Sequence, residues 1–215
     1  MKIKNIFFDF DGVIAESVNV KTRAFYQMYE KFGKDIAEKV VEHHKNHGGM
    51  SRFEKFKHYH KDFLNIDLTP EQIDDLADMF SGLVKQGVID APEVPGVRHF
   101  LEKYHRIMNF WIISGTPTDE IRDIVKQKNM GHFFKECFGS PRKKNDWVKE
   151  LMNQNHLQKT ATVFVGDAKS DYQAALDNEI GFILRETPEG QSIFQDIDVP
   201  RFSTFPRFER ILEML

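Results

Sequence analysis

Two aspartates follow the first apolar run of the chain. Asp9 and Asp11 come directly after the apolar residues 6–8. Side chains two positions apart on a strand share a face, so both carboxylates should project together from the carboxyl end of that strand. Gly12 then allows the chain to turn. Aspartates are also common in solvated turns, so this pair alone leaves a catalytic role and a structural role open.

A hydroxyl and two lysines follow other apolar runs. Ser114 and Gly115 end the run in WIISGTP, where a hydroxyl and an unobstructed backbone N–H can bind phosphate oxygens. The segment FGSPRKKND offers Lys143 and Lys144, and its register favours Lys144. Taken singly, the Ser-Gly pair also fits an ordinary turn, and each lysine fits a solvated basic patch.

Two more aspartates come after the run VFVG. Asp167 follows it directly, and Asp171, four residues later, lies near the same side of a helix start. Asp167 alone could serve only as a helix N-cap. Parallel strands deliver their carboxyl ends to one edge of a sheet, so all these groups should converge on one crevice. Four carboxylates there would repel one another, and an oxygen-rich site that must also accept phosphate favours magnesium over zinc.

The elements that must position these groups alternate along the chain. Short β-like apolar runs occupy residues 6–8, 110–113, 163–165 and 182–184, and residues 136–138 are a candidate fifth strand. Helical stretches at 96–105, 119–128, 146–155 and 171–179 alternate with them. This order predicts an α/β fold with a parallel sheet, because parallel strands need crossover helices.

The first two predicted strands are separated by a folded insert. Roughly a hundred residues lie between them, whereas a single-helix crossover takes about a dozen or more. The pattern of the insert predicts four helices, over residues 17–33, 34–48, 51 onward and 69–87. Three of these predicted helices end at a glycine. Ser51 with Glu54, and Thr69 with Gln72, have the spacing of capping boxes. The sequence therefore predicts an α/β core from residues 1–15 and 92–215 and an all-helical inserted domain from residues 16–91.

Composition excludes several classes of protein. The 215 residues are 40% apolar and 29% charged, the balance of a soluble globular protein. Thirty basic and 33 acidic residues give a net charge of -3, so we expect neither nucleic acid nor an acidic membrane as partner. A single cysteine, Cys137, rules out an internal disulfide and a cysteine zinc scaffold, and the short, charged N-terminal run does not fit a signal peptide. We expect a cytoplasmic protein, a monomer or homodimer, acting on a small molecule.

Four motifs together resemble one known family. DFDGVI at Asp9, IISGT at Ser114, a lysine in SPRKK and VGDAKSDYQAA at Asp167 occur in the order found in the haloacid dehalogenase superfamily, nearly end to end. The helical insert looks like the C1-type cap of the phosphoglycolate phosphatase and β-phosphoglucomutase relatives. The resemblance implies a Rossmann-like core and phosphoryl transfer through an aspartyl-phosphate.

The resemblance also implies a role for each motif residue. Asp9 would be the nucleophile and a metal ligand, and Asp11 the general acid and base, with its backbone carbonyl as a further ligand. Lys144, Ser114 and the Gly115 N–H would bind the transferring phosphoryl group. Asp167 would ligate Mg²⁺, and Asp171 would orient the groups around it.

The predicted function is hydrolysis of a small phosphomonoester by a magnesium-dependent phosphatase. The intact Asp11 argues against the dehalogenase branch, which needs no acid–base residue for phosphoryl transfer. A phosphomutase acting on a sugar phosphate would use the same residues, and sequence barely separates the two. A catalytically silent binding module is less favoured, because no nucleophile or metal ligand has been lost.

Two features of the insert have open interpretations. Gly48 and Gly49 form a flexible joint before Arg52, which lies in the first turn of a predicted helix, where the macrodipole disfavours a cation. Arg52 could form a surface salt bridge to a neighbour such as Glu54, or bind a carboxylate or second phosphate of the substrate. His43 and His47 share a helical face, but without a third ligand nearby we do not predict a zinc site.

Overall fold

A single parallel sheet forms the centre of the molecule in the computed structural model, which describes residues 2–187 and 194–215. The strand order among these residues is β3-β2-β1-β4-β5-β6, and every neighbouring pair is parallel. This order places β1 beside β4 at the point where the winding reverses, as in Rossmann-like folds. The strands are β1 (Asn5–Phe8), β2 (Asn109–Pro117), β3 (Glu136–Ser140), β4 (Thr162–Gly166), β5 (Gly181–Arg185) and β6 (Arg201–Phe202).

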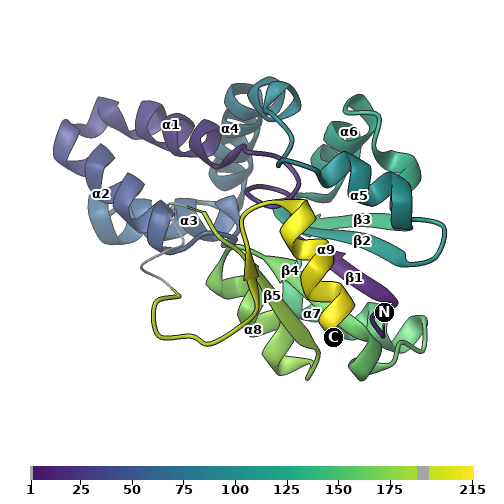
Figure 1. Ribbon diagram of the computed structural model, residues 1–215. Coiled ribbons are helices and arrows are strands. Elements are labelled where there is room, and N and C mark those ends of the chain that lie inside the picture. Colours follow the sequence, from purple (N-terminus) through teal and green to yellow (C-terminus); the bar gives the residue numbers. More distant parts are fainter. Residues whose placement is uncertain (1, 188–193) are drawn as a thin grey trace.

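Helices cover both faces of this sheet (Figure 1). Phe8 points to one face and packs edge-on against Phe100 and Phe110, with ring centroids 6.4 and 5.5 Å away. Phe7 points to the other face and packs against Trp111, with a centroid distance of 5.3 Å. One face carries α5 (Val97–Tyr104), α6 (Thr118–Gln127) and α9 (Phe205–Met214), and the other carries α7 (Lys144–Gln154) and α8 (Lys169–Asp177).

The expected α/β fold with a parallel sheet is thus confirmed. Its strands are continuous apolar runs in the sequence because helices bury them on both faces. Short 3₁₀ turns at η3 (Gly131–Phe133) and η4 (Lys159–Ala161) complete the connections. Within the described residues, no helix combines the length and apolar character needed to cross a bilayer.

The insert is all-helical, as expected, and lies beside the carboxyl edge of the sheet (Figure 1). Its core is aromatic, with Phe25 within 6 Å of Phe56, Tyr59 and Phe80, measured between ring centroids. The Thr69 capping box is present at the start of α4. The elements are α1 (Val18–Tyr29), η1 (Glu30–Phe32), α2 (Lys34–Asn46), α3 (Arg52–His58), η2 (Tyr59–Phe63) and α4 (Pro70–Asp90).

The predicted end of α4 at Gly87 is wrong, because the helix continues to Asp90. Gly87 lies where α4 packs on α1, and a Cβ atom there would come within 2.8 Å of Val20 Cγ1. This glycine allows close helix packing rather than ending the helix.

The two chain crossings between core and insert lie side by side. The Glu16 N–H donates to the Pro92 carbonyl at 2.9 Å, and the Val94 N–H donates to the Ile14 carbonyl at 3.0 Å. Both ends of the insert therefore leave the core at the same place. We propose that residues 16–91 form a cap domain on a core of residues 1–15 and 92–215.

Candidate active site

Three carboxylates meet at the carboxyl edge of the sheet. One oxygen each from Asp9, Asp167 and Asp171 lies within 4.8 Å of the others. Asp9 follows β1, Asp167 follows β4, and Asp171 lies in the first turn of α8, where it accepts a hydrogen bond from the Ala168 N–H at 3.1 Å. Gly12 has a φ of 77°, and a Cβ atom there would overlap an Asp167 oxygen, so this turn requires glycine.

Lys144 joins two of these carboxylates. Its Nζ lies 2.9 Å from Asp9 Oδ2 and 2.6 Å from Asp171 Oδ1, and the side chain is buried. Lys143 is exposed at the N-terminus of α7. The structure therefore brings Lys144, and not Lys143, into the carboxylate cluster. Asp171 has one oxygen on Lys144 and the other on the backbone, which makes it a positioning group for the lysine.

The cluster carries surplus negative charge. Burial raises the pKa of Asp9 to about 7, since the attraction of Lys144 is offset by repulsion from Asp171 and Asp11. Burial also raises the pKa of Asp167 well above its usual range, and Asp9 and Asp171 add to the effect. A divalent cation would favour the ionised form of both groups. Because every donor is a carboxylate oxygen, the site fits a hard cation such as Mg²⁺.

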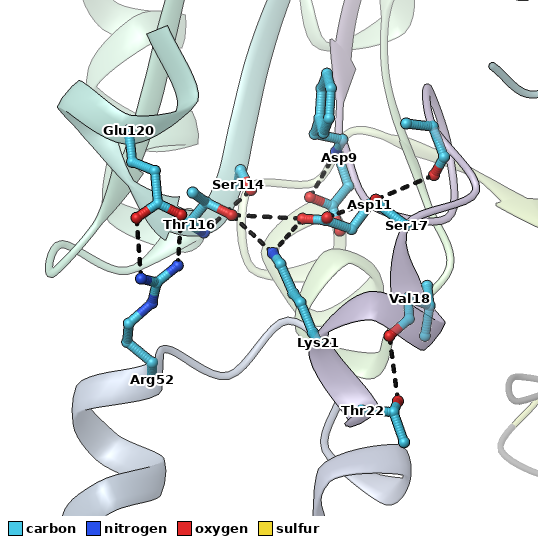
Figure 2. A network of polar contacts seen from close by, with 12 residues as sticks. Asp9, Asp11, Ser17, Val18, Lys21, Thr22, Arg52, Ser114, Thr116 and Glu120 are labelled. Atoms are coloured by element: carbon cyan, nitrogen blue, oxygen red, sulfur yellow. Dashed lines mark hydrogen bonds and ion pairs between the residues drawn. The ribbon is translucent and has the colours of Figure 1, made fainter. Parts of the chain in front are cut away.

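Asp11 does not point into this cluster. Its carboxylate accepts a hydrogen bond from Ser17 Oγ at 2.6 Å and pairs with Lys21, whose Nζ also donates to Thr116 Oγ1 at 2.7 Å (Figure 2). Burial alone would raise the pKa of Asp11, but Lys21 and Ser17 together hold it below its usual value. Asp11 is therefore ionised at rest, and its side chain is not placed as a metal ligand.

Ser17 and Lys21 were missed by the sequence analysis. They are four residues apart, and Lys21 lies on the first helix of the insert, α1, whose start faces the end of β1. A basic residue one turn into the helix after the DFDGVI motif was the available signal.

Ser114 and Gly115 lie inside β2 rather than at its end. The strand continues to Pro117, with a register shift against β3 between Ile113 and Pro117. The register shift interrupts the ladder of backbone hydrogen bonds to β3 near the site. There the Thr116 N–H donates a hydrogen bond to Ser114 Oγ at 3.1 Å. The expected strand end at Ser114 was wrong, but Ser114 and Gly115 do lie beside the crevice.

The double glycine of the insert reaches the core. Gly49 has a φ of 76°, which strains any other residue, and a Cβ atom there would overlap Ser170 Oγ. A Cβ atom at Gly115 would lie 3.0 Å from the Gly49 carbonyl oxygen. The loop around Gly49 therefore closes over the ends of β2 and β4.

Arg52 is not available to a substrate in this arrangement, contrary to the expectation that it binds one. Its guanidinium is buried and makes a two-point contact with Glu120 of α6, at 2.8 and 2.9 Å (Figure 2). Ser81 Oγ accepts a further hydrogen bond at 2.5 Å, and the Phe80 ring lies 4.7 Å away. The alternative partner Glu54 is not the one used. Arg52 therefore ties the insert to the core.

Breaking this buried pair should destabilise the protein strongly. We expect Arg52→Ala to lower the free energy of unfolding by about 3–5 kcal/mol, because Glu120 would be left buried without a counter-ion. Chemical denaturation measures the change. The matched control is Arg122→Ala, which removes an exposed pair with Glu136 and should cost at most about 0.5 kcal/mol. Equal losses in the two variants would contradict a special role for the Arg52 pair.

His43 and His47 stack on each other, with ring centroids 3.9 Å apart, and His47 Nδ1 is paired with the His43 carbonyl. His58 lies 4.2 Å from His43 between ring centroids, a neighbour that the sequence did not reveal. In the part of the chain that the structure describes, the aspartate cluster is the group with a geometry suited to a metal ion. The expectation of no zinc site at these histidines therefore stands as a prediction.

A cavity of about 80 Å³ lies between the core and the insert. The core contributes Asp9, Asp11, Gly115 and Asp167 to its wall. The insert contributes basic and aromatic groups, together with the Gly48–Met50 loop. The basic and aromatic groups are Lys21, Phe25, His44, Lys45, Arg52 and Lys55.

Comparison with known families shows to which family this chain belongs. The profile of the haloacid dehalogenase-like hydrolases matches residues 6–184. The chain belongs to that family. The matched range contains the aspartate cluster, Lys144, Ser114 and Gly115, so this hydrolase keeps all four motifs within it. No curated protein sequence matches this haloacid dehalogenase-like hydrolase significantly.

Solved structures share the fold over most or all of their length. A predicted phosphoglycolate phosphatase from Haemophilus somnus superimposes with a TM-score of 0.72 at 18% identity, covering 99% of both chains. A candidate β-phosphoglucomutase from Bacteroides vulgatus gives 0.75 at 16%, covering 98% of this hydrolase and 88% of that chain. A candidate hydrolase of the family from Bacillus subtilis, solved with magnesium, gives 0.69 at 12%, covering 99% of both. At these identities the likeness establishes the fold.

Proposed function

We propose that this hydrolase is a magnesium-dependent phosphatase that cleaves a small phosphomonoester through an aspartyl-phosphate on Asp9. The observation that carries the proposal is the cluster itself. Asp9 lies beside a second aspartate suited to a cation and against a buried lysine, at the wall of the cavity between core and insert. The phosphatase and mutase relatives with the same fold support this choice of chemistry.

Asp9 acts as the nucleophile. One carboxylate oxygen forms a bond to phosphorus while the bond from phosphorus to the leaving oxygen breaks. The Phe10 N–H donates to Asp9 Oδ1 at 2.7 Å, and Lys144 holds Oδ2, so the carboxylate is fixed in orientation before substrate binds. Water then attacks the phosphorus of the aspartyl-phosphate and releases inorganic phosphate and free Asp9.

Asp11 moves the protons of both steps. To protonate the departing alkoxide, Asp11 must first take up a proton from solvent, which the negative charge of a phosphate bound beside it favours. In the second step Asp11, ionised again, takes a proton from the attacking water. Its neighbours Ser17 and Lys21 hold it at the edge of the cavity beside Asp9.

Lys144, Ser114 and the Gly115 N–H stabilise the phosphoryl oxygens. Burial would lower the pKa of Lys144, but its attraction to Asp171 and Asp9 outweighs this effect and raises the pKa above the usual value. Lys144 is therefore positively charged. Asp9, Asp167 and the Asp11 carbonyl would hold Mg²⁺, which supplies charge neutralisation between the attacking carboxylate and the phosphate dianion.

Removal of divalent cations tests this assignment. We expect phosphatase activity on alkyl and aryl phosphates to fall to background in EDTA and to return with Mg²⁺, because two anions must otherwise meet. Mg²⁺ should also raise the melting temperature, since it relieves repulsion between Asp9 and Asp167. Full activity in EDTA would contradict the proposal, whereas a raised melting temperature without activity would support the metal site alone.

A phosphomutase is the second candidate, because one structural relative is a candidate β-phosphoglucomutase. A mutase would return the phosphoryl group from Asp9 to a sugar and would need a bisphosphate to keep turning over. Release of inorganic phosphate from simple esters without a bisphosphate favours the phosphatase. Turnover that depends on an added sugar bisphosphate favours the mutase.

A further inference from the structure

The cations at the cavity wall differ in their partners. Lys21 pairs with Asp11, and Arg52 pairs with Glu120. Lys55, on α3, is as buried as Arg52, yet within the described residues no carboxylate lies within salt-bridge distance of its Nζ. Among the described residues, Lys55 therefore has no counter-ion, although it is buried at the wall of the cavity.

Lys55 contacts a neutral imidazole and an aromatic ring. Its Nζ lies 2.7 Å from His44 Nδ1 and 5.5 Å from the centroid of the Phe25 ring. Burial holds the pKa of His44 well below its usual value, and Lys55 lowers it further. Nδ1 of the neutral His44 accepts a hydrogen bond from the Lys55 ammonium group, so the imidazole proton of His44 is on Nε2.

Such a lysine is costly unless an anion joins it. Burial lowers its pKa to about 7, with Lys21 adding to the shift. A buried ammonium without a counter-ion is unfavourable, and a leucine or methionine would fill the same space without that penalty. Lys55 also lies at the wall of the cavity that contains Asp9, so a bound molecule can reach it.

The two sides of the cavity are opposite in charge. Asp9, Asp11 and Asp167 line the core side, where the phosphoryl group would bind. Lys21, Lys45 and Lys55 line the insert side, where the leaving group would extend. Arg52 is the other cation on that side, and its guanidinium already donates two hydrogen bonds to Glu120.

We propose that Lys55, supported by His44, binds an anionic group on the leaving group of the substrate. The inference rests on the proposed phosphatase function and narrows its substrate to a phosphomonoester that carries a carboxylate or a second phosphate. The cavity of about 80 Å³ that Lys55 lines favours a small leaving group.

Ligand binding to an inactive protein tests this without turnover. The Asp9→Asn protein is titrated calorimetrically with three esters in Mg²⁺: phosphoglycolate, ethanediol bisphosphate and ethyl phosphate. Phosphoglycolate and ethanediol bisphosphate carry a second anionic group, which ethyl phosphate lacks. We expect one of these two esters to bind about 10- to 100-fold more tightly than ethyl phosphate, because hydrogen bonds to charged groups are strong. Which of them binds more tightly distinguishes a carboxylate from a phosphate.

Substitution of the lysine should remove the preference. Lys55→Met, made in the Asp9→Asn protein, should bring the affinity for the preferred anionic ester to within about threefold of that for ethyl phosphate. Lys55→Gln keeps a polar group beside His44 and should have the same effect, in case the methionine variant folds poorly. The matched control is Lys57→Met, an exposed lysine two residues away on α3, which should keep the preference.

The outcomes separate the two proposals. Equal affinity of the Asp9→Asn protein for all three esters, or a preference unchanged by both Lys55 variants, overturns the role of Lys55. Turnover of the same esters by the unmodified protein is measured separately. Failure to hydrolyse any of them argues against the phosphatase, while a Lys55-dependent preference in binding would still support the anion site.

Discussion

Replacing Asp9 by asparagine should reduce phosphatase turnover at least about 10⁴-fold while the protein stays folded. The amide has the shape of the carboxylate but is not a nucleophile, so no aspartyl-phosphate can form. Release of inorganic phosphate from an aryl phosphate in Mg²⁺ measures the loss. Circular dichroism then shows whether the fold is kept.

The same substitution should not lower stability in the absence of metal. Asp9 is ionised only at a cost, because burial and two neighbouring carboxylates raise its pKa to about 7. Its ionised form therefore subtracts from stability above that pH, and the penalty fades as the pH falls towards the pKa of an unfolded aspartate. At pH 8 in EDTA we expect Asp9→Asn to melt at or above the temperature of the unmodified protein.

Asp75→Asn provides the matched control, because Asp75 is exposed on α4 and lies outside the cavity wall. It should leave both turnover and melting temperature unchanged. Retention of more than about one per cent of activity in Asp9→Asn would remove Asp9 from the mechanism.

The core could be predicted from the sequence because its strands are buried on both faces. Residues 6–8, 110–113, 163–165 and 182–184 are continuous apolar runs, and each lies within an observed strand. Once the sheet is parallel, its topology carries Asp9 and Asp167 to one edge without any knowledge of side-chain packing. The gathering of Asp9 and Asp167 was therefore predictable. The preference for Lys144 over Lys143 rested on the register of the third motif, and its catalytic role stays a prediction.

The contacts between insert and core were not predictable in the same way. Lys21 with Asp11 and Arg52 with Glu120 join residues that are respectively 10 and 68 positions apart. Such pairs depend on how the helices of the insert pack on the core, and neither periodicity nor capping specifies that packing. Arg52 was noticed for its odd position at a helix start, but its partner lies on α6, outside any local pattern.

These contacts give the insert a direct part in the candidate chemistry. Lys21 lies on α1 of the insert and reaches both Asp11 after β1 and Thr116 in β2. A movement of α1 away from the core would therefore remove the cation that keeps Asp11 ionised. The protonation of Asp11 and the closing of the cavity are linked through this one lysine.

Asp11→Asn should slow turnover about 10²- to 10⁴-fold, the usual worth of proton transfer by a positioned group. The loss should fall on kcat, because Asp11 is ionised at rest and serves the water step as a base. An aryl phosphate has a leaving group that departs without a proton, so Asp9 should still be phosphorylated in this variant. Rapid mixing should then show a burst of about one aryl alcohol per site, followed by slow steady turnover.

Lys21→Met tests the same assignment by pH. Without Lys21 the pKa of Asp11 should rise, since this lysine is the main group that lowers it against the effect of burial. A base must be ionised to act, so the acid limb of the kcat profile should move to higher pH in Lys21→Met. In Asp11→Asn that limb should be absent. A raised KM with unchanged kcat in Asp11→Asn, and no burst, would show instead that Asp11 only binds the substrate.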